Sequence, residues 1–441
     1  MSRRLLIVSP HFPPVNAADH QRVRLALPFL REHGWEPWVL AVDPLDVAAP
    51  QDPLLCQTYP ADIPVLRVRA LPTRLTRPFG LGSLGLRCWP GIATAGRRLL
   101  QQQQFDLVFF STTQFTVFAL GPHWRRRFGV PYVLDYQDPW YNDYYARTGV
   151  RPPGGRIKYG IAQTQARFLE PAAVRHASHI LSVSPDYPQV LQRRYPSLRP
   201  ADCSVLPFGG SEQDFDLLRH TPVSQTQFDP KDGRRHWVYV GRGGPDMALA
   251  LQGFFIALQS ARQARPQDFQ KLQLHFIGTS YAPTGQAEAS VYPVAQACGV
   301  SDLVQEHPTR IPYFEALQCL LDADVLIVPG SDDPSYTASK IYPYILARKP
   351  LLGIFHQQST VVDVLKQTGA GTVVTFESGE QIPTLASRVY QAWFALGPPQ
   401  APNTRWPAFQ PYTGAAMTAG LCQIFDRIVP AYLSPTQSQC P

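Results

Sequence analysis

The sequence predicts an α/β protein with two Rossmann-like, doubly wound parallel sheets, each in a domain of its own. The chain has 441 residues, which is more than one hydrophobic core usually organises. Short runs rich in Val, Ile and Leu alternate with amphipathic stretches, as buried parallel strands alternate with helices. This alternation pauses near residues 205–216 and then restarts.

Each element follows from its own pattern of residues. In the first half, buried strands are predicted at residues 5–9, 36–42, 107–111, 132–135 and 179–183. Helices are predicted between them at residues 19–33, 115–128 and 157–176. In the second half, strands are predicted at residues 237–241, 272–278, 325–329 and 351–355, and helices at residues 246–262, 311–323 and 414–429. We therefore expect residues 1–210 to form the first domain and residues 211–441 the second.

The distribution of charge along the chain limits the classes of partner that we expect. Up to residue 205 there are 24 Lys and Arg against 14 Asp and Glu, a balance of +10; the remainder has 16 against 19, or −3, and the sum is the net +7 of the chain. A basic first half suits an anionic partner such as a membrane surface or a lipid phosphate, although an ordinary solvated surface explains it equally well. No nucleic-acid-binding module is recognisable, so nucleic acid is not expected as a partner.

The seven scattered cysteines form no C-x-x-C pair, which fits a reducing cytoplasm and predicts neither a disulfide framework nor a zinc site. No stretch reaches the roughly 20 apolar residues needed to span a bilayer. The run at residues 5–8 is too short for the core of a signal peptide. We expect a cytoplasmic protein, with peripheral association to the inner face of a membrane as an option.

Ligands of doubly wound sheets bind at the carboxyl ends of the strands, so the loops that follow strands are the candidate sites. The loop at residues 9–22, SPHFPPVNAADHQR, is an irregular segment that a plain loop with a helix cap also explains. In VLDYQDPW (residues 133–140), a strand ends in carboxylates. Asp135, Asp138 and Asp143 suggest an acid/base or hydrogen-bonding role, with helix capping as the alternative. No histidine pair or calcium-loop spacing accompanies them, so we expect no metal.

Two loops in the second half suggest anion binding. In VYVGRGGPD (residues 238–246), Gly241 and Gly243 let backbone N–H groups approach a ligand, and Arg242 supplies a forked donor for phosphate; an ordinary tight turn is the alternative. In PSYTASKIYPYILARKP (residues 334–350), backbone N–H groups near Ser339 lie next to the cation of Lys340. Two such sites in one domain indicate a diphosphate rather than a single phosphate.

Pro343 constrains the second of these loops, because proline is tolerated only in the first turn of a helix. We expect the helix to start at about Ser339, with its first turn distorted or shifted by Pro343. Proline offers no hydroxyl or carboxylate to a ligand, so any contact with a ribose would have to come from Tyr342, Tyr344 or Ser335.

The chain resembles the GT-B glycosyltransferases, whose two Rossmann-like domains face a central cleft, and within them the retaining, family-four type that uses nucleotide sugars. The resemblance rests on IPYFEALQCLLDADVLIVP (residues 311–329), SKIYPYILARKPLL (residues 339–352), the G-R-G-G loop, SPHFPPVNAADHQRVR and FGVPYVLDYQDPW.

The resemblance implies that Arg242 and the backbone at residues 338–340, with Lys340, hold the donor diphosphate from two sides. It places Thr309, Arg310 and Ile311 against the nucleotide base, and Gln137 and Asp138 where relatives have a pocket histidine near the transferred sugar. It places Asn16 and His20 on the loop that faces the acceptor. The implied donor-side residues are Gly241, Gly243, Arg310, Ile311, Ala338, Ser339 and Tyr342; the implied catalytic residues are Asp138, Gln137, Arg242 and Lys340.

The chain departs from this family pattern at several positions. Asn16-Ala17-Ala18 stands where many relatives have Gly-Gly, and Gly244-Pro245-Asp246 stands where a basic residue is usual. Ser335 and Pro343 stand where relatives have two glutamates eight residues apart.

The leading hypothesis is a glycosyltransferase that moves a sugar from a nucleoside diphosphate sugar to a glycan or lipid-linked acceptor in surface polysaccharide or glycolipid synthesis. No cofactor or metal is required, because Arg and Lys can neutralise the departing diphosphate. The alternatives are a non-catalytic binding or partner subunit of the same fold that has lost the paired glutamates, and a different GT-B enzyme such as an epimerase or a phosphorylase.

Overall fold

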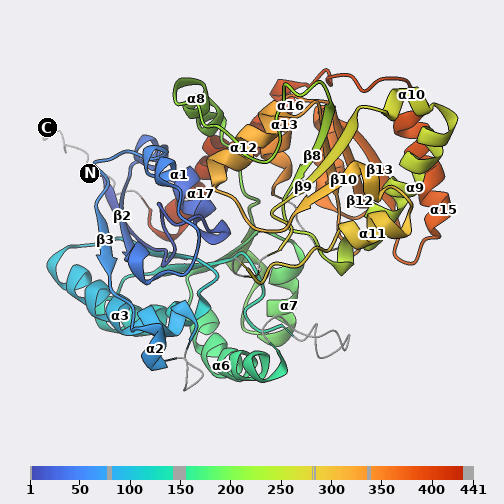
Figure 1. Ribbon diagram of the computed structural model, residues 1–441. Coiled ribbons are helices and arrows are strands. Elements are labelled where there is room, and N and C mark those ends of the chain that lie inside the picture. The colour runs from blue at the N-terminus through green and yellow to red at the C-terminus, as the bar shows by residue number, and fades with distance from the viewer. Residues whose placement is uncertain are drawn as a thin grey trace, which may run out of the picture. The chain divides into compact units, whose positions relative to one another are not determined.

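The computed structural model describes residues 2–76, 82–142, 155–280, 282, 285–334 and 339–430. The chain divides into two compact units, each built on one sheet (Figure 1). The first unit comprises Met1–Phe208 together with Gly414–Pro441, and the second comprises Gly209–Thr413. The predicted fold class of two Rossmann-like α/β domains is confirmed.

The sheet of the first unit has seven parallel strands in the order β3-β2-β1-β4-β5-β6-β7. The strands are β1 (Arg3–Val8), β2 (Trp35–Val42), β3 (Val65–Val68), β4 (Leu107–Ser111), β5 (Tyr132–Tyr136), β6 (His179–Ser182) and β7 (Cys203–Val205). The helices are α1 (Gln21–Ala26), α2 (Thr73–Thr76), α3 (Leu84–Gln102), α4 (Leu120–Phe128), α6 (Arg156–Arg175), α7 (Asp186–Arg194) and α17 (Gly414–Ile428).

Both faces of this sheet are buried, as the continuous apolar runs require. On β1, Leu5 and Ile7 pack into one hydrophobic cluster, and Leu6 and Val8 pack into another. Successive side chains of a strand point to opposite faces, so the two clusters lie on opposite sides of the sheet. The strand order reverses between β1 and β4, and the loops that follow these two strands therefore meet at the carboxyl edge.

The sheet of the second unit has six parallel strands in the order β10-β9-β8-β11-β12-β13. The strands are β8 (Arg235–Val240), β9 (Leu272–Ile277), β10 (Val304–His307), β11 (Val325–Pro329), β12 (Leu351–His356) and β13 (Thr372–Phe376). The helices are α8 (Glu212–His220), α9 (Ala248–Ala264), α10 (Pro266–Phe269), α11 (Tyr292–Ala297), α12 (Tyr313–Asp322), α13 (Ile341–Leu346), α14 (Thr360–Thr368), α15 (Ile382–Val389) and α16 (Trp406–Phe409). Here the order reverses between β8 and β11, the two strands that the candidate phosphate loops follow.

The last helix, α17, groups with the first unit, which differs from the predicted domain of residues 211–441. Phe425 of α17 packs edge-on against Trp35 and Phe109, with ring centroids 5.5 Å and 5.2 Å apart. Asp426 forms an ion pair with Arg3 at 2.6 Å and accepts a hydrogen bond from the Trp35 indole nitrogen at 2.9 Å. Through these contacts, α17 packs against the sheet of the first unit.

The helix predicted at residues 19–33 is divided into three short pieces. A 3₁₀ turn at Ala18–His20 leads into α1, and a second 3₁₀ turn follows at Leu30–His33. Pro28 lies between the last two pieces. Its ring prevents α1 from continuing, because proline lacks the N–H and collides with the carbonyl of the preceding turn.

Two glycines in helices of the first unit provide a matched pair of stability predictions. A Cβ atom on Gly96 of α3 would lie 2.3 Å from the buried Trp124 ring of α4, whereas a Cβ on Gly160 of α6 would meet nothing within 4 Å. We expect Gly160→Ala to raise the free energy of unfolding by ~0.5–1 kcal/mol, because alanine loses less backbone entropy on folding. Gly96→Ala should instead lower it by about 1–3 kcal/mol through overpacking. Urea denaturation of both variants measures the two changes in the free energy of unfolding, which should have opposite signs. Equal changes would contradict the close contact of α3 with α4.

Candidate active site

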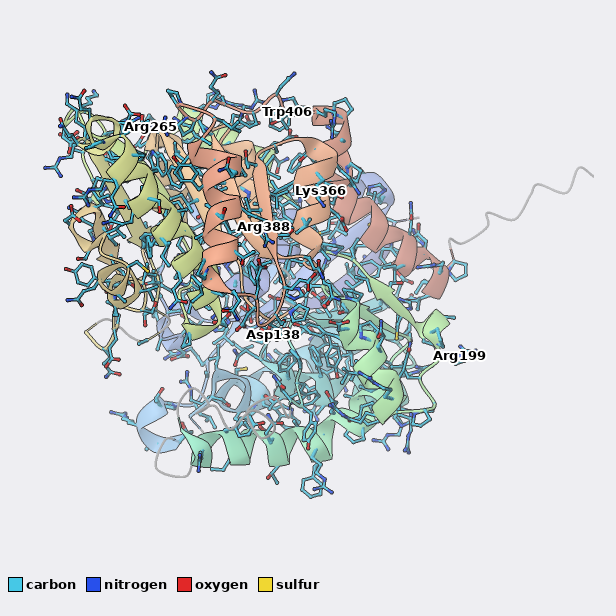
Figure 2. The ribbon with its side chains drawn as sticks, turned by 90° about the vertical axis from the view of Figure 1, so that its right-hand side faces the viewer. Asp138, Arg199, Arg265, Lys366, Arg388 and Trp406 are labelled. Atoms are coloured by element: carbon cyan, nitrogen blue, oxygen red, sulfur yellow. The ribbon has the colours of Figure 1, made fainter. Side chains whose placement is uncertain are left out.

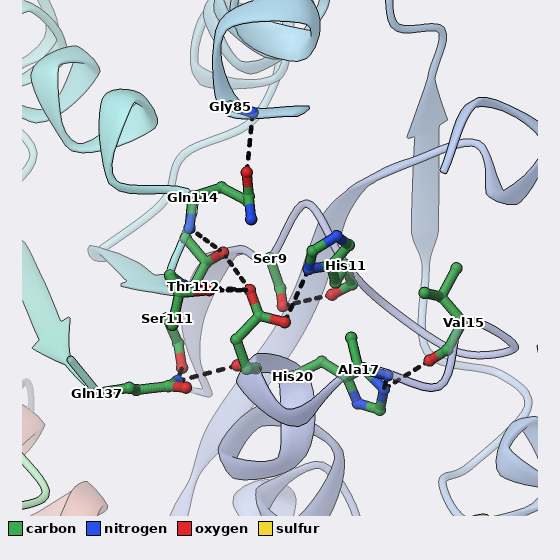
Figure 3. A network of polar contacts seen from close by, with 12 residues as sticks. Ser9, His11, Val15, Ala17, His20, Gly85, Ser111, Thr112, Gln114 and Gln137 are labelled. Atoms are coloured by element: carbon green, nitrogen blue, oxygen red, sulfur yellow. Dashed lines mark hydrogen bonds and ion pairs between the residues drawn. The ribbon is translucent and has the colours of Figure 1, made fainter. Parts of the chain in front are cut away.

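The carboxylate of Asp19 holds the loop after β1 to the loop after β4. Figure 3 shows the polar network of these two loops. One Asp19 oxygen lies 2.8 Å from Nδ1 of His11. The other accepts hydrogen bonds from the Thr112 hydroxyl at 2.8 Å and from the backbone N–H and hydroxyl of Thr113 at 3.1 Å. Burial alone would raise the pKa of Asp19, but the charge and hydrogen bond of His11 and the hydrogen bond from Thr112 hold it well below its usual range. Asp19 is therefore an anion at the reversal point of the first sheet.

Gln137 connects this loop to β5. Its amide nitrogen donates to the Asp19 carbonyl oxygen at 2.9 Å and to the Ser111 hydroxyl at 3.1 Å (Figure 3). It also donates to the Asp135 carboxylate at 2.9 Å. The side chain is buried. The structure thus places Gln137 inside the polar network that fixes the loop, and sequence reasoning did not anticipate these partners.

A fully buried ion pair between Arg22 and Asp135 adjoins the polar network of Gln137. Nε of Arg22 donates to Asp135 at 2.8 Å, and both side chains have no exposed surface. Arg22 also donates to the Leu206 carbonyl oxygen at 2.7 Å and lies over the Phe208 ring. The pair ties α1 and β5 to the segment that ends the first unit. A carboxylate at position 135 was recognisable in the sequence, but its partner, 113 residues away in the chain, was not.

The two predicted acceptor-side residues are buried parts of the loop after β1. Nε2 of His20 lies 2.7 Å from the Val15 carbonyl oxygen, and the Asn16 backbone N–H donates to Pro50. Burial and the nearby charge of Arg24 lower the pKa of His20 to about 4, against the opposing charge of Asp19. His20 is therefore neutral at pH 7 and donates through Nε2, so both residues shape the loop.

Asp138 follows β5 and is exposed; Figure 2 labels it among the side chains drawn as sticks. The surrounding protein nevertheless desolvates its carboxyl, and this effect, with the negative charge of Asp19, raises the pKa of that carboxyl to about 6. A carboxyl with such a pKa can exchange a proton near neutral pH. Asp143, the third carboxylate considered in this segment, lies outside the described residues. Among the residues that the structure describes, no group of three or more His, Cys, Asp or Glu side chains has the arrangement of a metal site.

In the second unit, the G-R-G-G loop leaves β8 with its backbone fixed by the neighbouring strand. The N–H of Gly241 donates to Ile277 at 2.9 Å, and that of Gly243 donates to Thr279 at 2.8 Å. A Cβ on Gly243 would lie 2.3 Å from the Ser290 hydroxyl, so this position admits only glycine without a shift. The guanidinium of Arg242 projects from this fixed loop and forms a two-point ion pair with Asp246 at 2.8 Å and 2.6 Å.

Tyr239 links Lys340 to the backbone of the loop that carries Arg242. Its hydroxyl donates to the Arg242 carbonyl oxygen at 2.6 Å and accepts a hydrogen bond from Nζ of Lys340. The Lys340 ammonium lies 4.7 Å from the centroid of the Tyr239 ring. The Lys340 ammonium thus lies beside the backbone of the loop that carries Arg242, where the order of the second sheet reverses. Sequence reasoning missed Tyr239, whose place at the end of β8 beside the glycine loop was the available signal.

The predicted helix start at Ser339 is wrong by two residues. Ser339 and Lys340 form a turn, and α13 begins at Ile341, so Pro343 lies inside the first turn. The Ser339 carbonyl oxygen accepts from the Tyr342 N–H at 3.3 Å, which is the i−3 spacing of a tight turn. Proline is accommodated because its missing N–H falls where no intrahelical partner is required. Ala338 and Ser335 lie outside the described residues.

The two tyrosines considered for ribose contact are built into the second unit. The Tyr342 ring is buried and stacks on Tyr412 with centroids 5.9 Å apart. The Tyr344 hydroxyl accepts from the Val240 N–H at 2.6 Å and donates to the Val240 carbonyl oxygen at 2.9 Å. Tyr344 therefore fastens α13 to the end of β8, which orients the turn that carries Lys340.

Arg310 and Ile311 are half-buried and follow β10 at the same edge of the sheet. The N–H of Gly278 donates to His307 at 2.7 Å, and that of Ser280 donates to Pro308 at 3.0 Å, so the loop after β9 runs beside this segment. Because β8, β9 and β10 are parallel neighbours, the structure gathers the described donor-side residues at one carboxyl edge.

Comparisons with known proteins agree with this layout. Residues 20–209 match the glycosyl transferase 4-like domain. No curated protein sequence matches the chain at a significant level.

Among solved structures, HepE of Anabaena in complex with UDP is 15% identical, with a TM-score of 0.55 and coverage of 96% of this chain and 100% of that one. WaaG, a glycosyltransferase involved in lipopolysaccharide biosynthesis, is 14% identical, with a TM-score of 0.52 and coverage of 97% and 100%. A UDP-forming trehalose-phosphate synthase from Burkholderia xenovorans is 13% identical, with a TM-score of 0.57 and coverage of 98% and 100%. Residues 20–209 therefore resemble the glycosyl transferase 4-like domain, and the whole chain shares the GT-B fold of two Rossmann-like domains with these solved structures.

Proposed function

We propose that the protein is a glycosyltransferase that moves a sugar from a nucleoside diphosphate sugar to a glycan or lipid-linked acceptor. The observation that supports this most is the Lys340 ammonium on the Tyr239 hydroxyl, which also binds the backbone of Arg242, in a chain whose residues 20–209 match the glycosyl transferase 4-like domain. HepE has been solved with UDP and with UDP-glucose, which supports a uridine nucleotide as the donor class. WaaG takes part in lipopolysaccharide biosynthesis, which supports a role in surface polysaccharide or glycolipid synthesis.

In this proposal, catalysis is positioning together with stabilisation of the departing diphosphate. Arg242 donates a planar fork to phosphate oxygens, and Lys340 supplies a second positive charge. Gly241 and Gly243, whose N–H groups donate to Ile277 and Thr279, fix the loop that carries Arg242, and the backbone near Ser339 supplies neutral donors. With two cations at the leaving group, no metal is required for charge neutralisation.

Other residues take roles around the transferred sugar. Arg310 and Ile311 lie against the nucleotide base. Tyr342, which follows Lys340 in the first turn of α13, supports the turn that carries Lys340. Asp138 exchanges a proton with the acceptor or sugar, and Gln137 acts as a positioning residue through the loop after β1. Asn16 and His20 shape the loop on the acceptor side. The transferred sugar is a hexose, and its anomeric configuration is retained.

A thermal-shift panel with UDP, GDP, ADP and their sugars tests this proposal. A ligand that binds only the native state stabilises it, by about 2.7 kcal/mol at a concentration of 100 times Kd. We expect one nucleotide class, with its diphosphate and its sugar conjugate, to raise the melting temperature. The absence of a shift with every nucleotide would overturn the proposal.

The proposal extends to peripheral binding at an anionic membrane surface. Among the described residues, no helix is both long and apolar enough to cross a bilayer. The exposed arginines on the adjacent helices α3 and α4 are Arg97, Arg98, Arg125, Arg126 and Arg127. A basic surface of this kind attracts anionic lipid headgroups over about a Debye length, ~10 Å at 0.1 M salt.

We expect the protein to sediment with anionic vesicles and to be released as salt rises. Replacing Arg98, Arg126 and Arg127 with Gln should weaken that binding by about tenfold or more, at ~1 kcal/mol for each surface cation. Arg125 is kept, because it donates to the His176 carbonyl oxygen at 2.6 Å. The matched control replaces three exposed cations of the second unit, Arg219, Lys231 and Arg234. Equal binding to neutral and anionic vesicles would contradict the proposal.

A further inference from the structure

The guanidinium of Arg242 already holds an anion. Its two terminal nitrogens donate to the two carboxylate oxygens of Asp246 at 2.8 Å and 2.6 Å, and about a quarter of each side chain is exposed. This two-point geometry is the one by which arginine also binds phosphate. A carboxylate and a phosphate that approach this edge of the guanidinium therefore compete for the same two nitrogen donors.

The loop makes room for this ion pair. A Cβ atom on Gly244 would lie 2.6 Å from the bonded Asp246 oxygen and 2.8 Å from the bonded Arg242 nitrogen. Any side chain at this position would press into the pair. The glycine between the two charged residues therefore leaves room for the pair in the observed arrangement.

The carboxylate can leave Arg242 while the backbone of the loop stays in place. The Asp246 carbonyl oxygen accepts a hydrogen bond from the Asp332 N–H at 2.7 Å, so the loop after β11 holds the main chain independently of the side chain. Burial raises the pKa of Asp246, but the hydrogen bonds and charge of Arg242, helped by a hydrogen bond with Ser331, outweigh it and leave the pKa below its usual range. Asp246 is consequently an anion at neutral pH.

We propose that Asp246 is the resident counter-ion of Arg242 and that the diphosphate of the donor must displace it from the guanidinium. The inference rests on the proposed function and adds a residue that sets donor affinity. While the site is empty, Asp246 neutralises Arg242. When the spent nucleoside diphosphate leaves, the carboxylate returns to the fork and favours its release. Asp246 thereby weakens binding of both donor and product.

The test is calorimetric titration of the full-length protein with inorganic pyrophosphate and with UDP. Asp246→Asn keeps the shape of the side chain and removes its charge. We expect it to tighten binding of both probes by about tenfold, which corresponds to one charge-assisted interaction of ~1.4 kcal/mol. Asp332→Asn is the matched control, because it removes an acidic side chain near the pair that does not hold the Arg242 fork. It should change affinity by less than about threefold, as expected for a partly screened charge.

The outcomes separate this inference from the proposed function. Unchanged or weaker pyrophosphate binding by a folded Asp246→Asn protein would overturn the inference and make Asp246 a support for Arg242. If UDP binds the parent and Asp246→Asn equally, the proposed function stands and the inference fails. If pyrophosphate binding tightens while no nucleotide binds, Asp246 is a displaceable counter-ion of Arg242 but not one that a donor displaces, and the proposed function fails. A melting temperature of Asp246→Asn within a few degrees of the parent establishes that the variant is folded.

Discussion

Replacing Asp135 with Ala is expected to lower the free energy of unfolding of the first unit by about 3–5 kcal/mol. The substitution leaves the Arg22 guanidinium fully buried without its carboxylate, and a buried unpaired charge is costly. It also removes the acceptor of the Ser111 hydroxyl at 2.8 Å and of the Gln137 amide at 2.9 Å. Because Gln137 holds the loop after β1, we expect the loop to loosen as well.

Chemical denaturation monitored by the tryptophans measures this loss. Asp62→Ala is the control, because Asp62 pairs with Arg31 on the surface of the same unit and should leave the unfolding midpoint almost unchanged. The double variant Arg22→Met, Asp135→Leu removes both charges and should recover much of the lost stability. If Asp135→Ala unfolds at the same denaturant concentration as Asp62→Ala, the buried pair is not what fastens β5 to α1.

Arg242→Ala is expected to weaken nucleotide binding at least tenfold and to reduce the rate of sugar transfer by about 10²–10³. The larger effect on rate follows because negative charge on the diphosphate grows as the bond to the sugar breaks. Arg242→Lys keeps the charge without the planar fork and should recover part of the binding and less of the rate.

Steady-state kinetics and calorimetry on the same preparations distinguish these contributions. The control is Arg265→Ala, which removes a cation elsewhere in the second unit, where Arg265 pairs with Asp268 near α10. It should change neither affinity nor rate. Full transfer activity in a folded Arg242→Ala protein would reduce the G-R-G-G loop to a structural turn.

Strands that are buried on both faces were predictable from sequence because their apolar runs are continuous. The predictions for β4 and β11 coincide with the observed Leu107–Ser111 and Val325–Pro329. The edge strand β3 was missed because Val65–Val68 is half-exposed and short. The long helix α3 was missed because its sequence contains Pro90 and three glycines, which are residues that usually interrupt helices.

The membership of α17 in the first unit depends on contacts that no local pattern contains. The apolar face of Gly414–Ile428 predicts a helix, but only the partners Trp35 and Phe109 determine which sheet it covers. The predicted boundary at residue 210 lies close to Phe208, where the first unit is interrupted. The sequence therefore predicted where the chain leaves the first unit, but not that α17 belongs to the first unit again.

In the candidate site, too, some features were predictable from the sequence and others were not. The loops after β1, β5, β8 and β11 were recognisable because glycines, carboxylates and cations follow apolar runs. The partners of those residues were not recognisable, since Asp246 on Arg242, Tyr239 on Lys340 and Arg22 on Asp135 are products of the folded chain. Pro343 was correctly identified as a constraint, and of the two expected outcomes, a distorted or a shifted first turn, the structure shows the shift, with α13 beginning at Ile341.

The most direct test of the central claim is release of nucleoside diphosphate from a nucleotide sugar. The donor is the nucleotide sugar that gives the largest thermal shift, and the acceptor probe is a mixed extract of bacterial glycolipids and lipid-linked glycans. The parent protein should release nucleoside diphosphate in step with the appearance of a glycosylated product by mass spectrometry, and Arg242→Ala should release it at least a hundredfold more slowly. Binding of the nucleotide sugar with equal background release by the parent and Arg242→Ala would contradict catalysis and leave a nucleotide-binding protein of the GT-B fold.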